Sequence, residues 1–360
     1  MYLATTSRNV TRRRRLLTTA GVAVVAALSL AGCAGGAGAE DTASSDSGEE
    51  LTTIRVSLGW IKNVEWAGFW IADQMGYYEE EGLDIEWIGG GPNAPTTMAT
   101  LAADGADIGI VPGTQSWLQT FADGNDWTAI GALFQESPGA LVSLASDPVR
   151  TAEDLVGKTV LGQEGTQINY DAAFKIAGLE PDYDFIPVGF DIAPLVDGQG
   201  IAYTAYATNQ PIMLEEQYGL APDDYVVTLY ADLGMPLYGN VIYGDSSYVS
   251  DNGDDMEGFL RASIRGWEEN GDDPAVAAEL AVNDFGADLG LDLKQQTREN
   301  ELQQELVVGE YGDPLFWMDP ALMTELMYPG LEVAGYTDLP APEDYVDMSY
   351  LEAAHASLEG

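Results

Sequence analysis

A short segment near residue 60 brings together side chains that could bind a small planar molecule. Trp60 and Trp66 flank Lys62, Asn63 and Glu65 in the sequence WIKNVEW. A tryptophan ring offers a flat apolar face, and a carboxylate or amide can hydrogen-bond to the edge of a stacked heterocycle. We therefore interpret Trp60, Asn63, Glu65 and Trp66 as candidate ligand-binding residues. Two alternatives stay open: Trp66 would suit core packing where a helix starts, and Glu65 would complement the N-terminus of that helix.

Two turns after predicted strands form a second group of candidates. Each opens a helix, where exposed backbone N–H groups suit an acceptor or an anion. The first turn holds Gly113, Thr114 and Gln115. The second, at the equivalent place in the other half of the chain, holds Glu164, Gly165 and Thr166. An ordinary helix cap is the alternative for both turns.

Aromatic and amide side chains in the second half complete the candidate site. Tyr203, Tyr206 and Asn209 belong to or follow a predicted strand, and Tyr238 follows a later connecting segment. We predict that they contact the ligand, with structural packing as the alternative for each tyrosine.

Metal and nucleophilic chemistry find little support in the composition. The chain has one His, His355, and one Cys, Cys33, which excludes His clusters, Cys-rich metal sites and a disulfide framework. The segment 251–255 (DNGDD) lacks the spacing and terminal Glu of an EF-hand loop. We predict no catalytic residue, no metal and no cofactor.

The charge balance excludes one class of partner. The 360 residues include 59 Asp and Glu against 14 Lys and Arg, a formal net charge of -45. Phosphate backbones would repel such a chain, so nucleic-acid binding is excluded. We interpret the acidity as a surface adapted to stay hydrated in a saline environment.

The N-terminal residues have the layout of an export signal. Consecutive arginines precede an apolar run at 21–30, which is shorter than the ~20 residues of a membrane span. The run ends in Leu30-Ala31-Gly32-Cys33, which resembles a bacterial lipobox and predicts lipidation of Cys33. Residues 34–51 are small and polar and predict a flexible tether. Export by the general or the twin-arginine route stays open.

Strands and helices alternate along the rest of the chain, which predicts an α/β fold with largely parallel sheets. The expected strands lie at 54–59, 83–88, 107–111, 127–134, 140–145, 159–162, 184–188, 201–205, 225–229 and 241–243. From residue 255 onward the pattern is mainly helical.

The stretch from Trp60 to Gly91 carries a specific resemblance. Its landmarks are Trp60, Ala67-Gly68-Phe69, Gly76-Tyr77-Tyr78, Glu81-Gly82-Leu83 and Gly89-Gly90. In this order they resemble the opening of the substrate-binding proteins of ABC importers, in the branch for sulfonates, nitrate, thiamine pyrimidine precursors and riboflavin. Weaker matches lie at 107–110, 134–135, 154–159 and 206–211.

The resemblance implies a two-lobed type II periplasmic-binding-protein clamshell with the ligand between the lobes. We expect lobe 1 at 52–146 and 235–330, lobe 2 at 147–234, and a C-terminal segment, 331–360, that packs on lobe 1. The connecting segments are expected near Ala145–Asp147 and Asp232–Pro236. The implied protein is a monomeric extracytoplasmic lipoprotein, held to the membrane by its lipid alone, that delivers a small molecule to ABC permease subunits.

The residue types in the candidate loops favour a heteroaromatic ligand. Aromatic and carboxylate side chains dominate these loops, and Lys62 is the one basic residue among them, so we expect a thiamine pyrimidine precursor or a riboflavin-like compound. The loop 89–95 (GGGPNAP) is similar to these two subgroups. A binder of aliphatic sulfonate, taurine or nitrate is the first alternative. The second is an enzyme, a thiamine pyrimidine synthase of the same fold, which is disfavoured because no suitable His or Cys motif is present.

Overall fold

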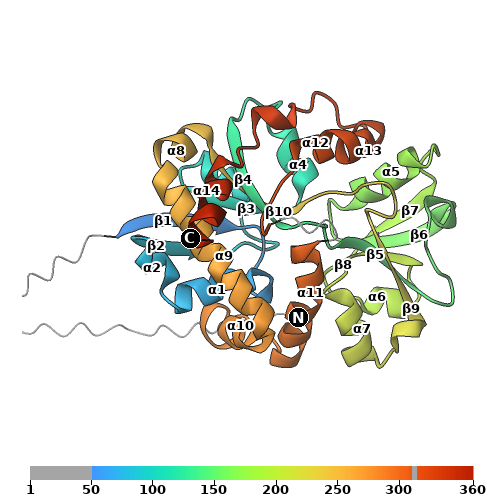
Figure 1. The fold of residues 1–360 in the computed structure, drawn as a ribbon. Helices are drawn as coiled ribbons and strands as arrows, with labels where there is room; N and C mark the ends of the chain where they lie inside the picture. Colours follow the sequence, from blue (N-terminus) through green and yellow to red (C-terminus); the bar gives the residue numbers. More distant parts are fainter. Residues whose placement is uncertain (1–50, 310–313, 360) are drawn as a thin grey trace, which may run out of the picture. The chain divides into compact units, whose positions relative to one another are not determined.

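The computed structural model describes residues 51–309 and 314–359. These residues fall within one compact unit, Glu49–Gly360. Their strands form two separate five-stranded sheets, each flanked by helices (Figure 1). The predicted signal peptide at 1–33, with Cys33, and nearly all of the predicted tether lie outside the described residues.

The first sheet has the strand order β2-β1-β3-β10-β4. Its strands are β1 (Thr52–Leu58), β2 (Leu83–Ile88), β3 (Ile108–Val111), β4 (Trp127–Phe134) and β10 (Gly239–Asp245). β1 pairs in parallel with β2 and β3, whereas β10 runs antiparallel to both β3 and β4. We call this sheet and the helices packed on it the first lobe.

The second sheet has the strand order β7-β6-β8-β5-β9. Its strands are β5 (Gly139–Leu144), β6 (Lys158–Gly162), β7 (Tyr183–Pro187), β8 (Ala202–Tyr206) and β9 (Tyr225–Leu229). β6 is parallel to β7 and β8, whereas β5 is antiparallel to β8 and β9. This sheet and its helices are the second lobe.

The α/β class and the position of each expected strand are confirmed, but the sheets are mixed rather than largely parallel. The reason lies in how the chain changes lobes. It leaves the first lobe at the end of β4 and re-enters it at the start of β10, and Gly239 pairs with Phe134 at that edge. A strand that starts where its neighbour ends must run antiparallel to it, and the pair Gly139 and Tyr206 shows the same arrangement for β5.

Residues 135–138 and 230–238 connect the lobes. The expected first connection at Ala145–Asp147 is therefore wrong, because β5 already belongs to the second sheet. The error has a physical cause: β4 and β5 are separated by a segment as short as a hairpin loop, which made them resemble neighbours. The second connection includes the expected Asp232–Pro236.

The larger helices of the first lobe follow its strands or lie late in the chain. They are α1 (Ala67–Gln74), α2 (Tyr77–Glu80), α3 (Thr97–Ala102), α4 (Thr114–Gln119), α8 (Ser246–Asp251), α9 (Gly253–Asp272), α10 (Pro274–Leu280), α11 (Leu293–Val308) and α14 (Ser349–Leu358). Those of the second lobe are α5 (Gln167–Ile176), α6 (Ala193–Val196) and α7 (Gln210–Tyr218). Figure 1 shows α11 between the first-lobe helix α10 and the second lobe.

The C-terminal segment contacts both lobes. After α12 (Pro320–Leu322) and η5 (Met323–Met327), helix α13 (Tyr328–Ala334) packs on α5, where Lys175 Nζ donates to the Ala334 carbonyl at 2.6 Å. The chain then returns to the first lobe, where Val346 bridges to Ala129 and α14 packs on α9. The expectation that residues 331–360 pack on lobe 1 is thus correct for α14 but not for the end of α13.

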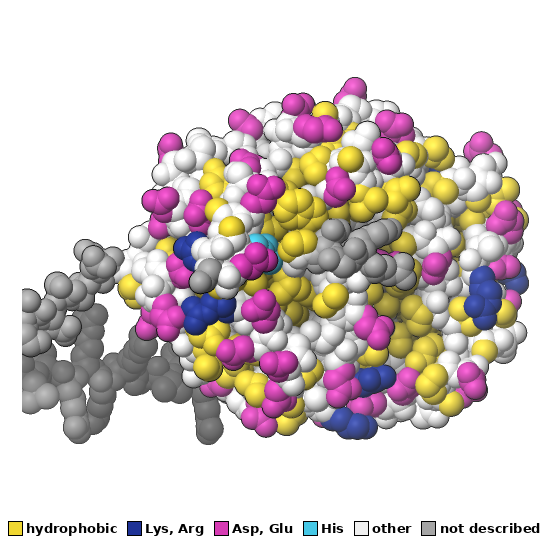
Figure 2. All heavy atoms as spheres, in the orientation of Figure 1, with side chains coloured by type: hydrophobic (Ala, Val, Ile, Leu, Met, Phe, Trp, Pro, Cys, Tyr) yellow, Lys and Arg dark blue, Asp and Glu magenta, His cyan; other side chains and the backbone are white. Residues whose placement is uncertain are grey.

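Acidic side chains are spread over the face in Figure 2, with few basic ones among them. Most basic side chains of the described part are paired, for example Arg55 with Asp107 and Arg261 with Glu81. Among the described residues, no helix is both long and apolar enough to cross a membrane.

Candidate functional site

The ends of three strands bring the main candidates together. Trp60 and Glu65 follow the end of β1, Asn209 follows the end of β8, and Asn240 lies at the start of β10. The register of β10 with β4 and of β5 with β8 places these ends where the chain crosses between the lobes. Such edges of α/β sheets are where ligands commonly bind.

The turn that follows β1 is fixed by its own side chains. Asn63 caps η1 (Val64–Trp66), because its Oδ1 accepts a hydrogen bond from the Glu65 amide at 3.3 Å. Trp70 Nε1 donates to the Asn63 carbonyl at 2.8 Å. Trp66 Nε1 donates to the Ile61 carbonyl at 2.9 Å, and its ring is fully buried. These contacts set the position of Glu65.

Two side chains of helix α11 hydrogen-bond to the backbone of the same turn. The Val64 amide donates to Gln296 Oε1 at 2.8 Å, and Gln303 Nε2 donates to the Val64 carbonyl at 2.9 Å. Both glutamines are buried. Since Gln296 and Gln303 lie seven residues apart, they lie two turns apart on one helix face, and Glu299 lies between them on that face.

Asn240 is the partner of Glu65. Its Nδ2 donates to Glu65 Oε1 at 2.7 Å, and both residues are buried. The backbone of Asn240 has φ +54°, in the left-handed region, which Asn tolerates better than most side chains. Its Oδ1 is buried without a hydrogen-bond partner. A buried carbonyl oxygen without a donor is costly and points to a missing partner.

One hydrogen bond joins the lobes beside this pair. Asn209 Nδ2, at the N-terminus of α7, donates to Glu299 Oε2 at 3.0 Å, and Gln296 Nε2 donates to the same oxygen at 3.2 Å. An ion pair between Lys294 and Glu216, at 2.9 Å, lies between the same two helices.

Two tyrosines of the second lobe complete the group. Burial raises the pKa of Tyr206 well above its usual value, and the charge of Glu65 raises it further, so the hydroxyl lies near that carboxyl group. Tyr230, in the second connecting segment, lies near Tyr206 and accepts a hydrogen bond from Asn169 at 3.2 Å. We name Glu65, Tyr206, Asn209, Tyr230, Asn240 and Glu299 the interlobe cluster.

The two carboxyl groups of the cluster resist ionisation. Burial raises the pKa of Glu65 to about 7, partly opposed by the hydrogen bond from Asn240. Burial raises the pKa of Glu299 to about 8; the charge of Glu65 adds to the increase, and the bonds from Asn209 and Gln296 oppose it. The two groups therefore interact, and they titrate near neutral pH.

Trp60 lies at a second contact between the lobes. Its ring meets Phe190, which follows β7, with the ring centroids 4.8 Å apart and the planes at 61°. Trp60 is partly buried, and Phe190 is 39% exposed. This edge-to-face pair joins the two lobes through side chains that solvent can still reach.

Several predicted site residues have structural partners instead. Thr114 Oγ1 donates to the Tyr238 carbonyl at 2.7 Å, and the Tyr238 hydroxyl accepts from the Asp319 amide at 3.0 Å. Tyr203 is fully buried in the second lobe, where it donates to the Gly189 carbonyl at 2.6 Å and accepts from Gln163.

The two predicted turns lie apart from the cluster's hydrogen bonds. Gly113 is the N-cap residue of the short helix α4, and Gln115 is partly buried in its first turn. Thr166, the N-cap residue of α5, contacts Thr204 at 3.2 Å. Glu164 and Gly165 are exposed. Of the fourteen predicted binding residues, Glu65, Tyr206 and Asn209 enter the interlobe cluster, and Trp60 lies at the Trp60–Phe190 contact.

Sequence reasoning missed Asn240, Glu299, Tyr230 and Phe190. Glu299 lies in a helix rich in charged and amide residues, where one buried carboxyl group cannot be told from its exposed neighbours. The signal that could have found it is the spacing of Gln296, Glu299 and Gln303 on one face. Asn240 could have been noticed as an Asn next to Gly where the chain re-enters a strand.

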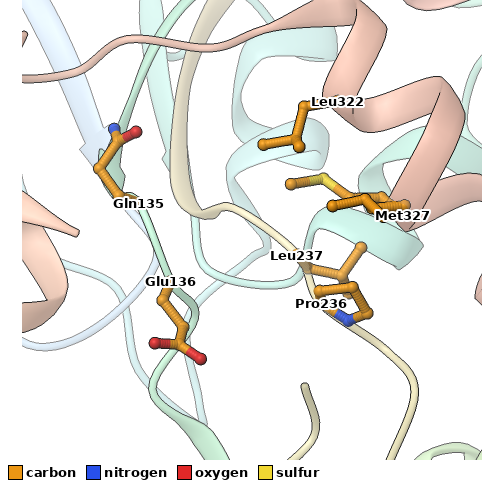
Figure 3. Close-up of a pocket in the computed structure, with 7 residues that line it drawn as sticks. Gln135, Glu136, Pro236, Leu237, Leu322 and Met327 are labelled. Atoms are coloured by element: carbon orange, nitrogen blue, oxygen red, sulfur yellow. The ribbon is translucent and has the colours of Figure 1, made fainter. Parts of the chain in front are cut away.

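A small pocket lies at the connecting segments. It holds about 470 Å³, counting space open to solvent, and is lined by Gln135, Glu136, Pro236, Leu237, Leu322, Leu326 and Met327. Figure 3 shows the apolar side chains gathered together, with the Glu136 carboxylate apart from them. None of the predicted site residues lines it. Among the described residues, no group of His, Cys, Asp and Glu has the arrangement of a metal site.

Three curated relatives align in sequence with most of this chain. A formylaminopyrimidine-binding protein of Halalkalibacterium halodurans is 28% identical over 67% of this chain and 73% of its own. A riboflavin-binding protein, RibY, of Chloroflexus aurantiacus is 26% identical over 73% and 76%. A 4-amino-5-hydroxymethyl-2-methylpyrimidine phosphate synthase of Legionella pneumophila is 26% identical over 63% and 72%.

Solved structures support the two-lobed fold. The aliphatic sulphonate binding protein SsuA of Escherichia coli gives a TM-score of 0.60 at 15% identity, covering 82% of this chain and 92% of its own. This likeness shows a periplasmic-binding-protein fold and no more. In sequence, the family model described as NMT1/THI5 like matches residues 63–277, more than half of the chain. The chain therefore belongs to the NMT1/THI5-like family.

Proposed function

We propose that this protein is the extracytoplasmic solute-binding lipoprotein of an ABC importer. It closes its two lobes around a small heteroaromatic nutrient, a thiamine pyrimidine precursor or a riboflavin-like compound, and delivers it to a membrane permease. No chemical step takes place on the chain in this proposal.

The observation that carries the proposal is the hydrogen bond between Asn209 and Glu299. It joins the second lobe to the first in the middle of a buried polar cluster, at the sheet edges where a ligand would bind. A buried polar group held across two lobes fits a cleft that closes by rotation of one lobe against the other. Trp60 and Phe190 supply aromatic surface at another contact between the lobes.

The relatives and the cluster favour a heterocycle as the ligand. Two of the relatives are named for binding formylaminopyrimidine and riboflavin, both of which contain planar nitrogen heterocycles. Carboxyl and amide groups can hydrogen-bond to the edges of such rings, and tyrosine and tryptophan rings can pack on their faces.

Sulfonate, taurine or nitrate binding is the alternative, and the cluster argues against it. An anion needs cationic or abundant N–H donors. The cluster holds two carboxyl groups, and no Lys or Arg contributes to the pKa of either one. Any charge that this carboxyl pair carries is negative and would repel an anionic ligand.

A pyrimidine synthase activity is the alternative of another class, and one relative carries such a name. The resemblance implies that such chemistry uses an active-site His and a Cys-rich motif. The sole His of this chain, His355, lies on α14 and its Nε2 hydrogen-bonds to the Leu315 carbonyl at 3.0 Å. The sole Cys, Cys33, stands at the predicted lipidation site, so we propose a binding protein.

The remaining parts of the proposal concern location and partners. We propose that lipidated Cys33 holds the protein on the outer face of the cytoplasmic membrane and that the folded body acts as a monomer. Its partners would be the small ligand and the permease subunits, with no nucleic acid.

Thermal unfolding of the purified protein with a ligand panel tests this function. The panel contains hydroxymethylpyrimidine, its formylamino analogue, thiamine, riboflavin, taurine, an alkanesulfonate and nitrate. A ligand at 100 times its dissociation constant adds about 2.7 kcal/mol to the free energy of unfolding. We expect a heterocycle to raise the melting temperature. Stabilisation by a sulfonate or nitrate alone would contradict the ligand class, and turnover of a bound heterocycle would contradict the binding-protein function.

A further inference from the structure

The interlobe cluster contains two buried carboxyl groups and lacks a matching cation. Glu65 accepts its side-chain hydrogen bond from Asn240, and Glu299 accepts from Asn209 and Gln296; all three donors are uncharged amides. Both carboxyl side chains are at least 95% buried. A buried charge without a counter-charge is costly, and two buried carboxylates that repel each other cannot both ionise freely.

The charged groups around the cluster face elsewhere. On α11, Lys294 pairs with Glu216 and Arg298 pairs with Glu301, both at the surface. Lys62 lies on the loop before η1, and its charge slightly lowers the pKa of Asp73, which burial raises. From the second lobe, Tyr206 lies near Glu65 and Tyr230 lies near Tyr206, and burial raises the pKa of both hydroxyls so that they stay neutral. No described side chain therefore supplies the positive charge.

Asn240 adds a second polar group without a partner. Its Nδ2 is used by Glu65, while its Oδ1 is buried without a donor. The left-handed backbone at φ +54° fixes this amide at the start of β10. The cluster thus lacks one positive charge and at least one N–H donor, and a protonated or amino-substituted nitrogen compound would supply both.

We propose that Glu65 and Glu299 share a proton in the unliganded protein, that a cationic nitrogen ligand replaces this proton, and that Asn240 Oδ1 accepts an N–H group of the ligand. This inference rests on the proposed function and names the ligand chemistry of the same site. The exchange is balanced: one ligand cation enters, one proton leaves to solvent, and no bond other than the O–H bond breaks. Asn240 is then a specificity-determining residue, and the pair couples ligand binding to pH.

Calorimetric titration with thiamine tests the exchange, because thiamine carries a fixed positive charge and an amino group. Titrations in two buffers of different ionisation enthalpy give the number of protons released per thiamine bound. At pH 7 we expect release of about one proton per thiamine bound and tighter binding as the pH rises from 6 to 8.5. Binding without proton release overturns the exchange.

Three variants assign the effect to residues. Glu299→Gln keeps the shape of the side chain, and we expect it to abolish proton release and weaken thiamine at least tenfold. Asn240→Gly keeps the left-handed backbone but removes the side-chain amide, both Oδ1 and the Nδ2 that donates to Glu65, and we expect about a tenfold loss of affinity. Glu305→Gln, an exposed position on the same helix, is the matched control and should change neither quantity. Equal behaviour of Glu299→Gln and Glu305→Gln overturns the assignment.

A measurement without ligand tests the shared proton separately. Carbon-13 NMR titration of the Glu carboxyl groups should show a signal that titrates near neutral pH and disappears in Glu299→Gln; its absence overturns the shared proton.

Failure of this inference and failure of the proposed function give different results. Stabilisation by riboflavin with thiamine and hydroxymethylpyrimidine silent overturns the cationic class and leaves the proposed function standing, whereas silence of the whole panel overturns both.

Discussion

Glu65 and Glu299 make the stability of the unliganded protein depend on pH. Their pKa values in the folded state, about 7 and about 8, lie above the usual Glu value of 4.5. The folded state therefore holds protons that the unfolded state releases. The stabilisation is complete below the unfolded pKa and is lost as the pH rises through the folded values.

We expect the melting temperature to fall by about 5 °C between pH 5.5 and 8.5. The double variant Glu65→Gln with Glu299→Gln should be less sensitive across this range, because it has no proton to lose at the cluster. Differential scanning calorimetry of both proteins provides the comparison. A pH profile identical in the two proteins would show that other groups cause the dependence.

Trp60 and Trp66 were both sequence candidates, with core packing as the alternative for Trp66, and the structure separates them. Trp60 meets Phe190 of the other lobe, whereas the Trp66 ring is fully buried within the first lobe. We expect Trp60→Ala to weaken ligand binding about tenfold with little change in unfolding free energy. Trp66→Ala should cost about 3–5 kcal/mol of stability. Paired urea unfolding and ligand titration would reveal the opposite pattern if the roles were reversed.

At the scale of elements, α11 positions the binding turn. Gln296 satisfies the Val64 amide and also donates to Glu299, so it supports both halves of the carboxyl pair. Gln296→Ala leaves that buried amide without its partner, which typically costs about 1–3 kcal/mol.

We expect Gln296→Ala to reduce both the stability and the ligand affinity, because Glu65 moves when η1 loosens. Urea unfolding and calorimetric titration measure the two effects. Glu305→Ala, exposed on the same helix, is the control. A loss of stability with unchanged affinity would mean that η1 keeps its position without this bond.

The elements themselves were predictable, while their partners were not. Alternating strands such as 83–88 (LDIEWI) and short buried strands such as 108–111 (IGIV) carry local signals that specify a strand. Whether a strand joins the sheet before it or a new sheet depends on contacts far along the chain, and β5 was misplaced for that reason. The same limit applies to the site: Glu65 lies beside Trp66 in sequence, whereas Glu299 comes close enough to Glu65 to interact with its charge only through the fold.

At the scale of the whole molecule, the excess of acidic residues dominates. A net charge of -45 on 360 residues causes repulsion among surface carboxylates, and dissolved salt screens it. We expect the melting temperature to rise as potassium chloride increases from 0.1 M to 2 M. The proton release at the buried cluster should change much less, because buried groups are screened weakly. A melting temperature that falls with salt would contradict this account of the acidity.

The position of β10 in the first sheet has a consequence for how the chain acquires its fold. β10 lies between β3 and β4, yet it is the last strand in the sequence, so β4 lacks its neighbour in the sheet until Gly239–Asp245 are available. The second sheet, by contrast, is built from the uninterrupted stretch Gly139–Leu229. In a chain that emerges from its N-terminus, the second sheet can be complete while the first still lacks the strand that joins β3 to β4. The carboxyl pair joins Glu65 of η1 to Glu299 of α11, so it forms only after α11 has been added to the chain.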